Sequence, residues 1–142
     1  THTFFWGDWH RDSVFGVERA SRISPTASSL EKGITFTVHN DAPVVPPDMI
    51  RLLWATTNRV TRSGRVLGEG QKISTLDALK AITINTAYQY FEEDKKGSID
   101  VGKQADLVVL SKNPLSIPSI ELLDIKVERT IARGNTIFKR SN

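Results

Sequence analysis

The chain has 142 residues and a mass of 15.8 kDa, with 39% hydrophobic and 25% charged side chains. These values are typical of a globular chain and exclude intrinsically disordered and collagen-like proteins. The longest uncharged apolar runs reach about six residues, against the roughly 20 that a membrane span requires. Cysteine is absent, which excludes disulfides and thiolate metal sites and leaves histidine and carboxylate as metal ligands.

The net charge of +3 is distributed unevenly along the chain. Residues 1–94 carry ten basic and eleven acidic side chains, whereas residues 95–142 carry nine and five. In the second part the basic residues lie between apolar positions of candidate strands, as on a solvated sheet face. No block of adjacent aromatic residues accompanies them for stacking on bases, so we expect no nucleic-acid partner and no membrane partner.

The chain opens with Thr-His-Thr-Phe-Phe-Trp and has no initiating methionine. These residues favour strands, so we interpret the opening as a strand cut part of the way along. We therefore expect the 142 residues to be the C-terminal piece of a longer protein.

Helix-like and strand-like patterns alternate in the first forty residues. Residues 3–6 predict the end of a strand. Residues 13–24 carry apolar side chains at helical spacing, and residues 28–32 predict another helical turn with Leu30 inward. Residues 34–38 alternate Ile, Phe and Val with threonine, and they predict the best-defined strand of the first half.

A helix is predicted over residues 48–59. Two prolines preset the backbone for its start, and Asp48 opposes the helix dipole in its first turn. We expect residues 61–70 to form a basic, glycine-containing loop after it. The side chains expected to be buried are Ile50, Leu53 and Trp54.

A second, longer helix is predicted from residues 74–77, which read Ser-Thr-Leu-Asp and resemble a capping box. We expect this helix to end near Glu93. Its inward face would carry Leu76, Leu79, Ile82, Thr83, Ala87 and Tyr90.

Strand patterns dominate the chain beyond Gly97. They cover Ile99 and Val101 and residues 107–110, 125–132 and 136–139, with a tight turn at residues 133–135. The sequence therefore predicts an α/β first part followed by a small antiparallel β unit.

The first candidate site residue is Asp41, which follows the predicted strand at residues 34–38 and precedes the loop into the next helix. Parallel α/β barrels place catalytic groups at such strand ends. His39 lies two residues earlier on the same side of an extended chain, so both side chains could face one site. The alternative for Asp41 is a loop or helix-capping aspartate.

A second candidate group lies at the start of the chain. His2, Trp6, Asp8 and His10 would suit a ligand pocket, with indole rings as apolar walls and N–H donors. The alternative is an aromatic plug that closes the end of the core.

Basic residues of the predicted loop could meet an anionic group of a substrate. Arg62 is the candidate that we carry forward, together with Arg65 and Lys72. The alternative is an ordinary solvated loop.

Residues 97–110 carry a family resemblance. They read Gly-Ser-Ile-Asp-Val-Gly-Lys-Gln-Ala-Asp-Leu-Val-Val-Leu, with Asn113-Pro114 following, and this run resembles the C-terminal motif of the amidohydrolase superfamily. Residues 39–44 resemble the His-Ser-Asp-Ala-Pro-Val element of amidohydrolase family 3, the branch that includes N-substituted formamide deformylases. Asn40 replaces the commoner serine, which affects local hydrogen bonding and leaves the carboxylate in place.

The resemblance implies a fold and a domain division. Residues 1–95 would be the last strands and helices of a metal-dependent (β/α)8 TIM barrel. Residues 96–142 would belong to a small composite β-sandwich built from both chain ends. The 142 residues would then be about the last quarter to third of an enzyme of this type.

The resemblance also implies roles for the site residues. Asp41 matches the aspartate that binds metal and handles the proton of the attacking water. His39, which could face the same site by its spacing, is the candidate for a second metal ligand. The metal would be divalent, with one or two zinc ions. The other ligands come from earlier strands, which these residues do not include, and His2 and His10 would shape the substrate pocket.

The implied function is hydrolysis of amide-like or cyclic C–N bonds in a small-molecule substrate. The alternative is a non-catalytic structural or interaction module that keeps this C-terminal fold. We expect the chain to pair with the remainder of its own protein or with a second copy as a homo-oligomer, because two isolated barrel strands would expose their edges. A cytoplasmic location is expected.

Overall fold

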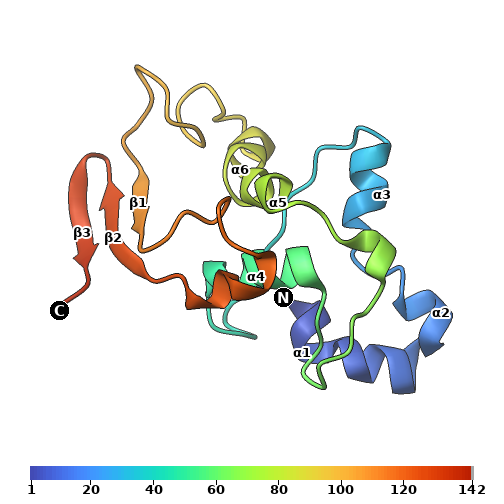
Figure 1. Cartoon of the computed structure of the whole chain (residues 1–142). Helices are drawn as coiled ribbons and strands as arrows, with labels where there is room; N and C mark the ends of the chain where they lie inside the picture. The colour runs from blue at the N-terminus through green and yellow to red at the C-terminus, as the bar shows by residue number, and fades with distance from the viewer. Residues whose placement is uncertain (142) are drawn as a thin grey trace.

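Helices come first along the chain and a small sheet comes last. A computed structural model describes residues 1–141, and Figure 1 shows the sheet at one end of the molecule, α1 to α3 at the other, and α4 between them. The α-helices are α1 (His2–Trp9), α2 (Gly16–Ala20), α3 (Thr26–Glu31), α4 (Met49–Asn58), α5 (Thr75–Ile82) and α6 (Ile84–Gln89). A π-helical stretch (His10–Val14) follows α1, and two 3₁₀ stretches are η2 (Glu69–Gln71) and η3 (Ser119–Asp124).

The sheet has three antiparallel strands in the order β1 (Leu107–Leu110), β2 (Val127–Ala132) and β3 (Asn135–Lys139). A tight turn joins β2 to β3, and Arg133 and Gly134 both have left-handed backbones, with φ of 50° and 80°. Two-residue hairpin turns that match strand twist require this conformation. The predicted strands at 107–110 and 136–139 and the predicted turn are confirmed, and β2 lies within the predicted strand at 125–132.

The buried core is centred on α4. Its Trp54 donates a hydrogen bond from Nε1 to the Ile120 carbonyl oxygen of η3 (3.1 Å), and Asn58 exchanges side-chain hydrogen bonds with Ser119 (both 2.9 Å). These bonds fix η3 along the helix. The buried core side chains are Leu53, Trp54, Ala55, Ile73, Ala78, Leu122 and Ile125.

The start of α4 agrees with its sequence prediction. Asp48 caps the helix by accepting a hydrogen bond from the Arg51 backbone N–H at 2.9 Å. Leu53 and Trp54 are buried as expected, and Ile50 is half-buried against the core. A capped terminus and one apolar face were sufficient to locate this helix.

The predicted helix from residue 74 to Glu93 is two helices in the structure. Ser74 caps α5 by accepting a hydrogen bond from the Asp77 backbone N–H at 3.1 Å, so the capping box is confirmed. The helix then breaks at Thr83, whose hydroxyl donates to the Leu79 carbonyl oxygen at 2.7 Å. Back-bonding of this kind bends helices. Leu76, Thr83 and Tyr90, all predicted inward, are exposed.

Two predicted strands of the first half are wrong. Residues 3–6 lie within α1, where Phe4 packs edge-to-face on Trp54 with ring centroids 5.8 Å apart. Residues 34–38 have no regular structure. A strand needs a neighbour for its backbone groups, and in residues 1–141 the named strands pair only within the β1–β3 sheet.

Three smaller predictions also differ from the structure. Residues 13–24 form the end of the π-helical stretch and the short α2, and not one helix. The helical turn predicted at 28–32 overlaps α3, but Leu30, predicted inward, is exposed. Ile99 and Val101 lie in an irregular segment and are exposed, so no strand forms there.

The described residues therefore form an α/β structure with an antiparallel sheet, as predicted for the fold class. No helix among residues 1–141 is both long and apolar enough to cross a bilayer.

A buried arginine joins three segments of the first half. Arg59, just after α4, is only 2% exposed and adopts a left-handed backbone with φ of 55°. Its guanidinium donates from Nε to the Leu67 carbonyl oxygen (2.7 Å), from Nη2 to that of Ile23 (2.7 Å) and from Nη1 to that of Ser24 (3.0 Å). These bonds hold the segments at 23–24 and 67 against the end of α4.

Close packing around Arg59 leaves no room for a side chain at Gly68. Gly68 has φ of 71°, and a Cβ atom there would lie 2.0 Å from the Ser21 carbonyl oxygen. We predict that Gly68→Ala lowers the free energy of unfolding by roughly 2–5 kcal/mol, from left-handed backbone strain plus displacement of Ser21. Urea unfolding followed by circular dichroism measures the loss.

Gly64→Ala is the matched control, because Gly64 also has a left-handed backbone (φ 83°) but no atom within 4 Å of a Cβ. It should cost only the backbone strain of roughly 1–2 kcal/mol. Equal losses in the two variants would contradict the packing described around Arg59.

Candidate functional site

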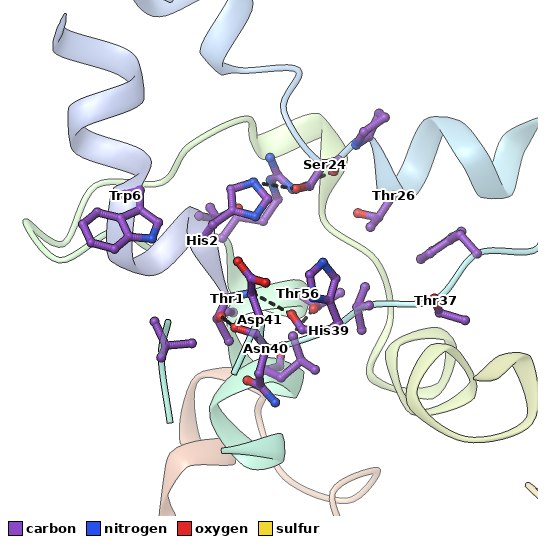
Figure 2. Close-up of a pocket in the computed structure, with 18 of the residues that line it drawn as sticks. Thr1, His2, Trp6, Ser24, Thr26, Thr37, His39, Asn40, Asp41 and Thr56 are labelled. Carbon is purple, nitrogen blue, oxygen red and sulfur yellow. Dashed lines mark hydrogen bonds between the residues drawn. The ribbon is translucent and has the colours of Figure 1, made fainter. Parts of the chain in front are cut away.

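The candidate site is a cavity of about 410 Å³ between α1, the residues that precede α3, the irregular segment through Asp41, and α4. Figure 2 shows the side chains that line it. The lining side chains that could bind a ligand or take part in a reaction are His2, Trp6, Ser24, His39, Asp41 and Arg59. The cavity therefore brings together four of the predicted site residues, His2, Trp6, His39 and Asp41.

Asp41 sits in a sharp turn on one wall of the cavity. Its backbone is left-handed, with φ of 65°, and its carbonyl oxygen accepts a hydrogen bond from the Val44 N–H at 2.8 Å. Aspartate is among the few non-glycine residues that tolerate this conformation. The side chain is exposed, and Figure 2 shows its carboxylate pointing into the cavity on the side of His2. The carboxylate is thus available to a ligand.

The segment that carries Asp41 is held on both sides. The Thr1 hydroxyl donates to the Asn40 carbonyl oxygen at 3.2 Å, and the Thr1 ammonium donates to that of His39 at 3.5 Å. Asn40 is buried, and its side-chain amide donates to the Met49 sulfur at 3.1 Å. Figure 2 shows this amide directed away from the Asp41 carboxylate. The Asn40 side chain therefore anchors the segment to the start of α4.

His2 faces the cavity from α1 and is kept neutral. Its Nε2 lies 3.0 Å from the Ser24 hydroxyl, and its ring packs edge-on to His10 with centroids 5.9 Å apart. Partial desolvation by the surrounding chain lowers the pKa of His2 to about 4 although the residue remains exposed, helped by electrostatic interaction with the Thr1 ammonium, His10, Arg59 and His39. The imidazole is therefore uncharged at neutral pH, so one of its nitrogens donates a hydrogen bond and the other accepts one.

Asp8 lies outside this cavity and organises a loop. Its carboxylate accepts hydrogen bonds from the hydroxyls of Thr61 (2.8 Å) and Ser63 (2.6 Å) and from the Ser63 N–H (3.0 Å). Burial acts to raise the pKa of Asp8, but these bonds and the charge of Arg65 outweigh it and hold the pKa below its usual range. Asp8 is committed to contacts with protein groups.

His10 and Arg62, also predicted as substrate contacts, do not line the cavity either. The His10 ring packs between Trp9 and Phe15, with centroids 5.3 Å from each. The Arg62 guanidinium lies 4.9 Å from the centre of the Phe5 ring in a cation–π contact. Both side chains therefore contact aromatic residues of α1 or of the segment that follows it.

The residues present can supply only part of a metal site. Asp41 and His39 line one cavity and have the oxygen and nitrogen donors that zinc accepts. Among residues 1–141, however, no three His, Asp or Glu side chains come close enough together to hold a metal ion. A complete site would need ligands from outside the described residues.

Two cavity residues were missed at the sequence level. Ser24 was assigned only to the end of a predicted helix. Arg59 was the last residue of the predicted helix at 48–59, and it lies away from the predicted inward face of Ile50, Leu53 and Trp54. Helical periodicity therefore did not indicate a buried cation at this position.

Comparison with known proteins places nearly the whole chain in one family. Residues 1–138 match the amidohydrolase family. The chain is 28% identical over 143 residues to the N-substituted formamide deformylase of Arthrobacter pascens, covering 97% of this chain and 26% of that protein. It is 46% identical over 67 residues to the imidazolonepropionase of Thermoplasma acidophilum, covering 46% of this chain and 16% of that protein.

A solved structure gives the same result for the fold. The amidohydrolase from Thermotoga maritima MSB8 aligns with a TM-score of 0.61 and 30% identity, over 81% of this chain and 26% of that chain. The chain thus spans about a quarter of the length of the deformylase and of the solved amidohydrolase.

The neutral state of His2 makes stability depend on pH. The unfolded chain protonates His2 near its ordinary pKa of 6.5, while the folded chain resists protonation until about pH 4. We predict that the free energy of unfolding falls between pH 6.5 and pH 4, and that His2→Gln reduces this fall. Urea unfolding at pH 7 and pH 5 measures both; an identical pH dependence in wild type and variant would contradict the assignment.

Proposed function

The chain belongs to the amidohydrolase family, in the branch of family 3, and on this premise we propose that it forms the C-terminal part of an enzyme that hydrolyses C–N bonds. The substrate class is amide-like or cyclic amide. The identity of two relatives, an N-substituted formamide deformylase and an imidazolonepropionase, supports this choice. The single observation that carries it is the shared cavity of Asp41, His39 and His2 in a chain matched to the family over residues 1–138.

We extend the proposal to the domains and to the partner. Residues 1–95 would complete a TIM barrel, in which the irregular segment at 34–38 would gain neighbouring strands. Residues 96–142 would complete a composite β-sandwich, because β3 is exposed along its whole length and carries Ile137 and Phe138. The partner that covers these surfaces would be the remainder of the same protein or a second copy.

We propose that the cofactor is a divalent metal, namely zinc. Asp41 and His39 would contribute two of its ligands, and the remainder of the protein would supply the others. When bound, the ion supplies Lewis acidity that polarises the scissile carbonyl and lowers the pKa of water towards neutrality.

Asp41 would perform the proton transfers. Its exposed carboxylate can hold a water molecule in the cavity, accept the water proton as a general base and return it to the leaving nitrogen as a general acid. We limit the proposed substrate contacts to His2 and Trp6, which line the cavity. The neutral His2 would then offer a hydrogen bond without adding charge.

Replacement of Asp41 tests the proposal. We predict that Asp41→Asn, in the protein produced at the full length of its gene and supplied with zinc, lowers hydrolysis of an N-substituted formamide by about 10²–10⁴-fold. Folding should be retained, because asparagine also tolerates the left-handed backbone at this position. Amine release measures the rate, and thermal unfolding measures the fold.

Asp48→Asn is the matched control, because asparagine caps a helix about as well as aspartate and Asp48 caps α4 outside the cavity. It should retain activity and stability. Wild-type turnover in Asp41→Asn would contradict the proposed role of Asp41, whereas absence of turnover in the wild-type protein would favour the non-catalytic module.

A further inference from the structure

The contacts of Arg59 extend from the core into the wall of the cavity. Arg59 follows α4, and its Nη1 donates to the Ser24 carbonyl oxygen at 3.0 Å. The hydroxyl of the same serine lies 3.0 Å from His2 Nε2. Two hydrogen bonds, one to the backbone and one to the side chain of Ser24, therefore link a buried guanidinium to a cavity imidazole. Figure 2 shows the Ser24–His2 contact.

Ser24 needs outside support for its conformation. Its backbone has φ of 49°, in the left-handed region that residues with a Cβ disfavour. The two peptide oxygens at this turn, of Ile23 and Ser24, are bound by the two terminal nitrogens of Arg59. The planar guanidinium fork suits two adjacent acceptors, whereas a lysine ammonium is a single point donor.

The Arg59 guanidinium bonds only to neutral backbone groups among the described residues. Among the ion pairs of residues 1–141 none involves Arg59, and its three hydrogen bonds all go to backbone carbonyl oxygens. Burial lowers the pKa of Arg59 to about 10, so the side chain remains protonated at neutral pH. A buried cation is costly unless its donors are satisfied, and here the bonds that satisfy Arg59 also set the turn at Ser24.

We propose that Arg59 is a positioning residue of the cavity: by holding the carbonyl groups of Ile23 and Ser24, it places the Ser24 hydroxyl on His2 Nε2 and fixes the imidazole in the cavity wall. The inference rests on the proposed function only where it treats the cavity as the substrate site. Loss of the fork frees His2 and leaves the turn that carries Asp41 in place, because Thr1, Met49 and Val44 hold that turn. Substrate binding is therefore affected more than the chemical step.

Chemical labelling of histidines tests the position of His2 directly. Diethyl pyrocarbonate acylates neutral imidazole nitrogen, and peptide mass spectrometry reports the rate at each histidine. In the protein at the full length of its gene, Arg59→Lys and Ser24→Ala should both raise the labelling rate of His2 several-fold, while His39 keeps its wild-type rate. Arg51→Lys, the same substitution on α4 in an ion pair with Asp48, should change neither rate.

The proposal requires Arg59→Lys and Ser24→Ala to release His2 by disrupting the same contact, the Ser24–His2 hydrogen bond. Adding Arg59→Lys to Ser24→Ala should raise His2 labelling no further than Ser24→Ala does alone. An unchanged His2 rate in a folded Arg59→Lys, or a parallel rise at His2 and His39, would overturn the proposal. If Arg59→Lys does not fold, Arg59→Gln, which keeps a planar pair of N–H donors, replaces it with the same expected direction.

Kinetics separate this inference from the proposed function. With an N-substituted formamide as probe, Arg59→Lys should raise KM several-fold and leave kcat within about twofold. A fall in kcat with unchanged KM would contradict a positioning role. If the wild-type protein hydrolyses neither an N-substituted formamide nor a cyclic amide, the proposed function fails while the labelling result still decides the role of Arg59.

Discussion

The first half of the chain is arranged around a buried guanidinium that forms no ion pair with any carboxylate among residues 1–141. Arg59 is 2% exposed, and each of its three hydrogen bonds ends on a backbone carbonyl oxygen. A buried cation is costly unless its donors are hydrogen-bonded. The three bonds of Arg59 hold the segments at 23–24 and at 67 against the end of α4, and the close packing there leaves no room for a side chain at Gly68.

The cavity follows from this convergence. The segment at 23–24 forms one wall and presents Ser24 to His2. The segment that carries Asp41 forms another wall and is held separately by Thr1 and by Met49 at the start of α4. One side of the cavity is thus fixed by a buried cation and the other by a turn that leaves a carboxylate free. This arrangement agrees with the proposed function, in which His2 contacts the substrate on one side and the Asp41 carboxylate acts from the other.

The features predicted from sequence are those that depend on local contacts. The cap at Asp48, the capping box at Ser74 and the β2–β3 turn each involve residues a few positions apart. Residues 34–38 show the limit, because β-branched alternation indicates what a segment prefers, while a strand exists only where a neighbouring strand accepts its backbone bonds. The break at Thr83 is an exception, because the hydroxyl bond from Thr83 to Leu79 is also local but helical periodicity does not show which threonine bonds back to its own helix.

The candidate site shows the same division. His39 and Asp41 are close in sequence and were predicted together, and the cavity contains both. Asp8 was predicted with His2, Trp6 and His10 as a pocket residue, but a carboxylate that could bind substrate looks the same in sequence as one that orders a loop with Thr61 and Ser63. Ser24 and Arg59 meet across 35 positions, so only the folded chain reveals that they share a wall with His2.

The central claim is that Asp41 contributes to a metal-dependent active site, and the most direct test is the location of the metal. We would crystallise the protein at the full length of its gene with zinc and collect anomalous diffraction at the zinc absorption edge. The account predicts an anomalous peak about 2.0–2.2 Å from an Asp41 carboxylate oxygen, the distance of a zinc–carboxylate bond. A zinc peak ligated elsewhere in the protein, with Asp41 uncoordinated, would contradict it.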